Sequence, residues 1–118
     1  MSRKYLNEKW CVRCGRNSPT PYLVKNMKLF PIEGEVLDIG CGNGRNSKFM
    51  IENGYEVTST DMVGDFGIEM VLGQDDLPEG KFDIILANYI LMFLIEEERE
   101  RVIQQIIDHS KTGTMLMV

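Results

Sequence analysis

The chain has 118 residues, of which 43% are hydrophobic and 26% are charged, a composition typical of one soluble globular domain with a core of its own. Its net charge of −5 argues against a nucleic-acid-binding surface, because such surfaces are basic. No apolar run approaches the roughly 18 residues of a membrane span, and the N-terminus lacks the apolar stretch of a secretory signal. With only three cysteines, the sequence predicts a reduced, cytoplasmic setting and no membrane partner.

Residues 1–34 are expected to form an N-terminal segment that ends in a helix. The pair Cys11 and Cys14 has CxxC spacing but no second pair of ligands nearby, so we predict no metal site. Residues 18–21, SPTP, are typical of a helix start, with a capping hydroxyl followed by a proline in the first turn. Gly34 then ends this part of the chain.

Residues 35–118 alternate between strand-like and helix-like patterns. The expected strands cover residues 35–39, 55–60, 68–72, 81–87 and 114–118, and the expected helices cover residues 45–53 and 96–110. This alternation predicts an α/β fold with a doubly wound parallel sheet. With the strands numbered along the chain, right-handed crossovers lead us to predict the order 3-2-1-4-5.

A glycine-rich stretch, DIGCGNGRN, follows the first expected strand at residues 38–46. In open parallel sheets, ligands bind beyond the carboxyl ends of the strands, where the strand order reverses. A dinucleotide-binding loop reads GxGxxG, and its third glycine would stand at Arg45. The spacing therefore argues against a nicotinamide-dependent oxidoreductase.

Two acidic residues further restrict the class of ligand that could bind here. Asp38 would repel a diphosphate but suits a cationic amino group, and Asp61, at the end of the second expected strand, suits the hydroxyls of a ribose. A ligand with a ribose, an ammonium group and no phosphate fits this pattern, and S-adenosylmethionine (SAM) has these features. The alternatives are that Asp61 caps a turn and that Asp38 is a solvated acid at a strand end.

The run LDIGCGNGRNSKFMIENGYEV, followed by TSTD, resembles the class I SAM-dependent methyltransferases. Together with NYILMFL and HSKTG further along, it is most similar to the tellurite-resistance branch of that family. The resemblance covers residues 35–118 and implies a Rossmann-like, SAM-binding methyltransferase core.

The resemblance implies roles for individual residues. Those matching the motif around the methionine part of the cofactor are Asp38, Gly40 and Gly42, with Cys41 between them contributing backbone contacts only. Asp61 matches the acid that holds the ribose hydroxyls, and Met62 is expected to pack on the adenine. The loop facing the sulfonium and the methyl acceptor corresponds to Ala87, Asn88 and Tyr89.

The chain also departs from the family. The connection at residues 62–67 is too short for the usual crossover helix, and Gly73 stands near the position of the acid that meets the adenine amino group, for which we favour Asp75. The sequence stops inside the fifth expected strand, without the sixth and seventh strands of the family. We interpret this as a C-terminal truncation, and the exposed strand edge could support self-association.

The predicted function is in-line methyl transfer from SAM to a small molecule or a soft oxyanion. The alternative is a non-catalytic SAM-binding or interaction module. No general base is evident, because the one histidine, His109, is placed to interact with a helix dipole. Asn88 and Tyr89 are better candidates for lining the site. The Asn-Pro-Pro motif of nucleic-acid amino-methyltransferases is absent here, which argues against DNA bases as acceptors.

The N-terminal segment offers two residues near this core. Trp10 and Arg13 could fold over the cofactor as a lid, or Trp10 could anchor the segment on the flank of the sheet.

Overall fold

The computed structural model describes residues 18–63, 66–88 and 90–118. The predictions for residues 1–17, including the CxxC pair and the lid, and for Tyr89 lie outside the described residues. The five strands are β1 (Glu35–Ile39), β2 (Glu56–Asp61), β3 (Ile68–Glu69), β4 (Phe82–Leu86) and β5 (Ser110–Met117). They form one sheet in the order β3-β2-β1-β4-β5, and every neighbouring pair is parallel, which confirms the predicted topology.

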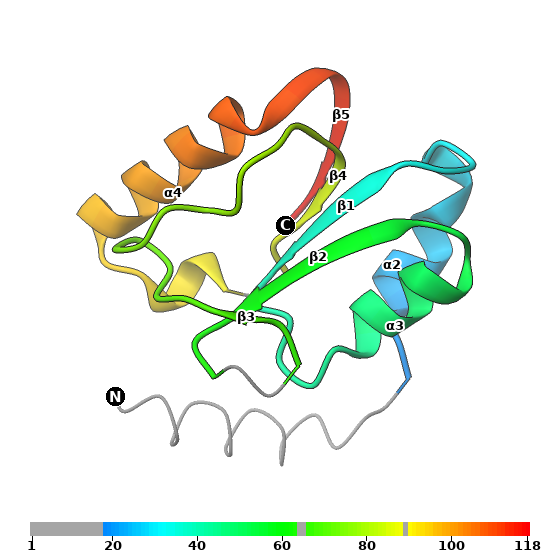
Figure 1. The fold of residues 1–118 in the computed structure, drawn as a ribbon, viewed down its shortest axis with the longest axis horizontal. Coiled ribbons are helices and arrows are strands. Elements are labelled where there is room, and N and C mark those ends of the chain that lie inside the picture. The colour runs from blue at the N-terminus through cyan, green and yellow to red at the C-terminus, as the bar shows by residue number, and fades with distance from the viewer. Residues whose placement is uncertain (1–17, 64–65, 89) are drawn as a thin grey trace.

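Helices lie on both faces of this sheet (Figure 1). One face is covered by α2 (Pro21–Asn26), which continues into the 3-10 turn η1 (Met27–Leu29), and by α3 (Arg45–Glu52). The other face is covered by α4 (Glu96–Asp108), and a second 3-10 turn, η2 (Leu91–Phe93), lies between β4 and α4. Within the described part of the chain, no helix has the length and apolar character needed to cross a bilayer.

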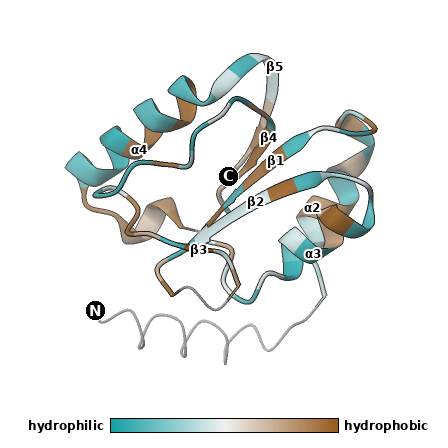
Figure 2. Cartoon of the chain, in the orientation of Figure 1, coloured by the Kyte–Doolittle hydropathy of each residue, from teal (hydrophilic) through white to brown (hydrophobic). Residues whose placement is uncertain are grey.

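Two hydrophobic cores follow from the alternation of side chains along the strands. In β1, Val36 faces the core beneath α2 and α3, whereas Leu37 and Ile39 face the core beneath α4. Met50 of α3 and Val102 of α4 are fully buried against these two faces. Figure 2 shows hydrophobic colour on β1 and hydrophilic colour over much of α4. Burial on both faces explains why the central strands read as nearly continuous apolar runs.

The third strand is shorter than the sequence predicted. It covers only Ile68 and Glu69, instead of residues 68–72, because the chain turns away after Met70 donates to the Asp61 carbonyl oxygen at 2.9 Å. Met70 and Leu72 then pack into the core beneath α4. The apolar character of this stretch therefore reflects core packing outside a strand.

The fifth strand begins earlier than predicted, at Ser110 instead of residue 114. Phe82 pairs with Ser110 but Ile84 pairs with Met115, so the register shifts between them. Gly113, at φ +88°, lies in the extra residues that form this irregularity. The Thr112-Gly113 turn signal therefore marks a bulge within β5, and the helix ends before it.

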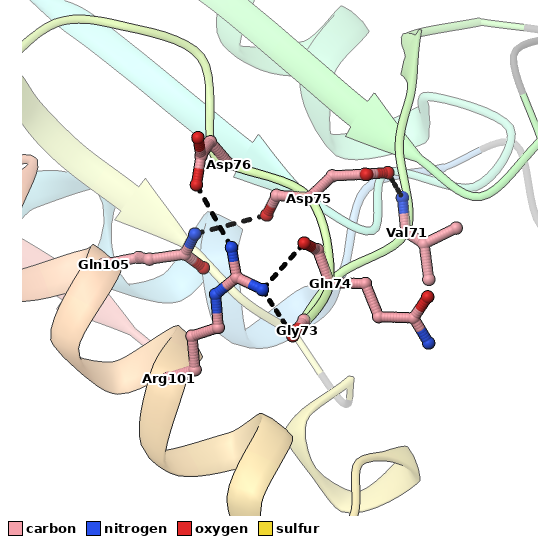
Figure 3. A network of polar contacts seen from close by, with 7 residues as sticks. All are labelled: Val71, Gly73, Gln74, Asp75, Asp76, Arg101 and Gln105. Carbon is pink, nitrogen blue, oxygen red and sulfur yellow. Dashed lines mark hydrogen bonds and ion pairs between the residues drawn. The ribbon is translucent and has the colours of Figure 1, made fainter.

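A loop takes the place of a crossover helix between β3 and β4, and it is bound to α4 (Figure 3). Arg101 donates from Nη1 to the carbonyl oxygens of Gly73 (3.2 Å) and Gln74 (2.7 Å), and from Nη2 to Asp76 (3.1 Å). Gln105, one turn further along, donates to the carbonyl oxygen of Asp75 at 3.2 Å. One helix face thus holds the loop mainly through its backbone.

We expect the Arg101→Ala variant to lose about 1–2 kcal/mol of unfolding free energy, because two backbone carbonyls lose a charged donor. Asp76→Ala should change stability by less than about 0.5 kcal/mol, since the Asp76 side chain is 93% exposed and the ion pair is solvated. Urea denaturation of both variants measures the two values. Equal losses for the two variants would show that the ion pair, and not the backbone contact, holds the loop.

Candidate functional site

The glycine-rich turn between β1 and α3 lies at the carboxyl edge of the sheet, where the chain order reverses between β1 and β4 (Figure 1). Gly40, Gly42 and Gly44 all have positive φ, at +70°, +58° and +81°, so the turn uses a conformation that other residues rarely adopt. The Cys41 N–H donates to the Thr60 carbonyl oxygen at 2.8 Å, which ties the turn to the end of β2.

The three glycines differ in what lies beside them. A Cβ atom on Gly40 would come within 2.6 Å of the Ile90 side chain, and one on Gly44 would come within 2.6 Å of the Phe66 ring. A Cβ atom on Gly42 would meet no described residue within 4 Å. Internal packing therefore accounts for Gly40 and Gly44, whereas only Gly42 among the three leaves its backbone open to an incoming molecule.

Buried polar residues gather around this turn. Among the described residues, those that are polar or charged and buried are Thr20, Asp38, Asn46, Ser47 and Thr60. Asn46 accepts a hydrogen bond from the Thr20 N–H (2.8 Å) and donates one to its hydroxyl (3.0 Å), which joins the start of α2 to the first turn of α3. Because burying polar groups is unfavourable unless they are paired, their concentration at one edge of the sheet marks a specialised region.

Asp38 is the buried acid of this region, with 3% of its surface exposed. Its Oδ2 accepts a hydrogen bond from Ser47 Oγ of α3 at 2.6 Å, and Ser47 Oγ lies 2.7 Å from Ser59 Oγ of β2. Burial raises the pKa of Asp38 to about 6, the Ser47 hydrogen bond opposes that rise, and the charge of Asp61 adds to it. A buried carboxylate with this pKa is suited to meet a cation.

Asp61 is the last residue of β2 and Met62 follows it, and both are half-buried. The Asp61 carbonyl oxygen accepts the Met70 N–H, which fixes the backbone at this point. Its carboxylate is close enough to raise the pKa values of both Asp38 and Cys41. The fold therefore brings the two predicted acids together beside the glycine turn.

Cys41 is buried within the turn, and its Sγ lies 3.8 Å from the Gly42 carbonyl oxygen. Burial, together with the charges of Asp38 and Asp61, raises the pKa of the thiol to about 12. The thiol therefore stays protonated at neutral pH and is not a nucleophile.

We expect iodoacetamide at pH 8 to leave Cys41 unmodified in the native protein and to modify it within minutes in urea, because unfolding restores an ordinary thiol pKa. Peptide mass spectrometry would follow Cys41 separately from Cys11 and Cys14. Rapid native labelling of Cys41 would contradict the buried, electronegative surroundings described for it.

The loop after β4 brings a second unusual polar group to the same edge. Ala87 is fully buried, and its N–H donates to the Met117 carbonyl oxygen at 2.8 Å. The Nδ2 atom of Asn88 is buried and has no hydrogen-bond partner among the described residues. A buried unpaired amide is unfavourable by about 1–3 kcal/mol, so this donor is available for a bound molecule.

Two other predicted residues lie away from the turn. Asp75 is exposed and accepts the Val71 N–H on Oδ2 at 2.6 Å, so its carboxylate closes its own turn beside α4 (Figure 3). Its contact with an adenine amino group stays a prediction. His109 contacts the Gln105 carbonyl oxygen through Nδ1 at 2.6 Å, at the end of α4 and far along the chain from the glycine turn. Within the described residues, no group of three or more side chains could hold a metal ion.

Sequence reasoning missed Ser47 and Ser59 as site residues. Ser47 lies three residues before Met50 and shares the buried stripe of α3, and Ser59 pairs in register with Asp38. The sequence did contain one signal for Ser47, which is a polar residue at a core position of the helix that follows the glycine turn.

A parallel sheet with this strand order, helices on both faces and a glycine turn at its switch point has the architecture of a Rossmann-like methyltransferase fold. The family described as "Methyltransferase domain" matches residues 3–118, and the chain belongs to it.

Within that family, the similarity is to proteins of the TehB type. The chain is 29% identical over 94 residues to a probable S-adenosyl-L-methionine-dependent methyltransferase TehB of Haemophilus influenzae (strain 10810), covering 67% of this chain and 33% of the relative. A crystal structure of a TehB-like SAM-dependent methyltransferase from Corynebacterium glutamicum superposes with a TM-score of 0.75 at 21% identity, over 96% of this chain and 71% of the other. TehB from H. influenzae gives a TM-score of 0.72 at 21% identity, over 89% and 42%. The chain thus spans about a third of the curated relative, and the structural matches support the fold.

Proposed function

We propose that this domain binds SAM at the carboxyl end of β1 and transfers its methyl group to a small-molecule acceptor. The observation that carries the proposal is the open space beside Gly42, in the turn that directly follows the strand of the buried Asp38. A cofactor with an ammonium group and no phosphate suits that combination. Membership of the methyltransferase domain family supports the same cofactor.

In this proposal, different residues contact different parts of the cofactor. Asp38 would pair with the ammonium of the methionine part, and Gly42 would let the backbone approach it. Asp61 would accept hydrogen bonds from the ribose hydroxyls, and Met62 would pack on the adenine. When bound, SAM supplies an activated methyl group on sulfur, so the protein's part is to align the acceptor with that group and exclude water.

The acceptor side is proposed to lie at the loop after β4. The unpaired Asn88 amide would donate to an oxygen of the acceptor, and the exposed Met92 and Phe93 of η2 would contact its apolar part. Apolar side chains beside a polar anchor are typical of small-molecule sites. The chain's net charge of −5 favours an acceptor other than a nucleic acid. A soft oxyanion is the narrower possibility, and the exposed edge of β5 is a proposed surface for self-association.

If Asn88 serves a ligand, the Asn88→Ala variant should unfold with a free energy equal to that of the wild type or up to about 1 kcal/mol higher, because an unpaired buried donor is removed. A structural asparagine would lose about 1–3 kcal/mol on the same change. Asn46→Ala provides the comparison, since it breaks two buried hydrogen bonds and should be destabilised. A loss at Asn88 as large as that at Asn46 would remove this residue from the site.

Calorimetric titration with SAM and, separately, with NAD tests the proposal. Binding of SAM alone supports it, whereas binding of NAD alone would overturn it. Turnover of labelled SAM with thiols, amines and oxyanions would then test catalysis. The second candidate, a SAM-binding module without activity, is favoured by the short connection at residues 62–67, and it predicts binding without transfer to any acceptor.

A further inference from the structure

A chain of two serine hydroxyl groups connects the Asp38 carboxylate to the neighbouring helix and strand. Ser47 Oγ donates to Asp38 Oδ2 at 2.6 Å, and Ser47 Oγ lies 2.7 Å from Ser59 Oγ. A serine hydroxyl has one proton to donate, and that of Ser47 is given to Asp38. Ser59 must therefore donate to Ser47, so both hydroxyls point toward the ionised carboxylate.

The three groups come from three elements that surround the glycine turn. Asp38 belongs to β1, Ser59 pairs with it in register on β2, and Ser47 is fully buried in the first turns of α3. Each hydrogen bond in such a chain polarises the next, so the pair of hydroxyls stabilises the charged carboxylate more than Ser47 would alone.

We propose that Ser47 and Ser59 are positioning residues that hold the Asp38 carboxylate ionised toward the ammonium of SAM, so that cofactor binding in mildly acidic solution releases one proton from Asp38 to the solvent. This inference rests on the proposed function, because it takes the bound cation to be that of SAM.

Other charged groups act on Asp38 as well. Among the described residues, Asp61 of β2 raises the pKa of Asp38 and Arg45 of α3 lowers it. Cys41 lies in the same region, but the pKa of its thiol is about 12, so it carries no charge near pH 6. On the other side of β1, the register partner of Asp38 is the apolar Leu86. The two serines are thus the direct hydrogen-bonding route through which the carboxylate is tuned.

The sign of the pH effect follows from the pKa of Asp38, about 6 in the protein without cofactor. Below that value the carboxyl is protonated and must lose its proton before it can pair with a cation. The affinity for SAM should therefore be about tenfold weaker at pH 5 than at pH 7. Over this range the cofactor's own amino group stays protonated, because α-amino groups have pKa values near 8.

The test is calorimetric titration of SAM into the whole chain between pH 5 and pH 7, in two buffers of different ionisation enthalpy to count released protons. The wild type should release close to one proton at pH 5 and almost none at pH 7. Ser47→Ala should move the midpoint of the pH dependence of SAM affinity to a higher pH. The affinity of this variant should then fall about fivefold from pH 7 to pH 6, where that of the wild type falls about twofold. Ser59→Ala should move the midpoint in the same direction by less, and Ser59→Thr, which keeps a hydroxyl, should restore it.

Ser110→Ala is the matched control, because Ser110 Oγ donates to the Ile106 carbonyl oxygen (2.7 Å), far from Asp38 in the sheet. It should alter stability without moving the midpoint. Carbon-13 NMR titration of the Asp38 carboxyl in the serine variants gives a readout independent of SAM. An affinity that does not change with pH, or a midpoint unmoved by Ser47→Ala while SAM still binds, would overturn this inference alone. Failure of SAM to bind at any pH would overturn the proposed function.

Discussion

Asp38→Asn should make the protein more stable at pH 7.5, by about 1–3 kcal/mol of unfolding free energy. Burial raises the pKa of Asp38 from 3.8 to about 6, so the folded chain prefers the protonated acid. The contribution of this group to stability is therefore favourable below pH 3.8 and declines as the pH rises through 6. Above that pH the folded chain holds a buried charge that the Ser47 hydrogen bond stabilises only in part. Asparagine has nearly the same shape and no charge, so it removes the penalty.

Urea denaturation at pH 4 and pH 7.5 measures this effect. The gain should be present at pH 7.5 and largely absent at pH 4, where the wild-type carboxyl is already protonated. Asp83→Asn is a control with the opposite sign, because hydrogen bonds from Lys111 and the Glu35 N–H lower the pKa of Asp83. That variant should lose stability at pH 7.5. A loss for Asp38→Asn at pH 7.5 would mean that the carboxylate serves folding instead of a ligand.

Gly42→Ala should abolish most of the SAM binding while leaving the fold intact. At φ +58° an alanine is strained by about 1–2 kcal/mol, and its methyl group would project into the open space where we place the cofactor. Overlap with a bound ligand is worth a further loss of about 1–3 kcal/mol, which corresponds to roughly a tenfold to hundredfold weaker affinity.

Gly54→Ala is the matched control for this substitution. Gly54 also has a positive φ, +94°, and a Cβ atom there would also meet nothing within 4 Å in the part of the chain that the structure describes. It follows α3 at the opposite end from the glycine turn. The two variants should lose similar stability, and only Gly42→Ala should lose SAM affinity. Equal affinities in the two variants would place the cofactor elsewhere.

The sequence was sufficient for the sheet order and for the placement of the glycine turn at the end of β1, where we propose the site. Alternating patterns located the strands to within a residue or two at β1, β2 and β4, since these carry long apolar or β-branched runs. The predicted bounds of β3 were wrong, because Met70 and Leu72 are apolar residues that pack into the core outside a strand. The predicted start of β5 was wrong, because Gly113 lies in a bulge within the strand, whereas a glycine at this position is also typical of a helix end.

Within the proposed site, the proximity of residues at the strand ends could be predicted, because the edge of a parallel sheet gathers them whatever the side-chain details. Ser47 and Ser59 could not be predicted, because their role depends on distances across three elements. Neither could the difference between Gly42 and its two neighbours, which depends on where Ile90 and Phe66 pack. The hydrogen bond from the Val71 N–H to the Asp75 carboxylate could not be predicted either, because it depends on the turn that follows the short β3.

Chemical-shift mapping of the nitrogen-15-labelled chain during titration with SAM tests the central claim most directly. We predict that the largest changes occur at residues 38–47, at Asp61 and Met62, and at Asn88, with small changes at Gly54 and along the outer face of α4. Changes concentrated on α4 or the β5 edge, or an unaltered spectrum at saturating SAM, would contradict the assignment of this edge of the sheet as the cofactor site.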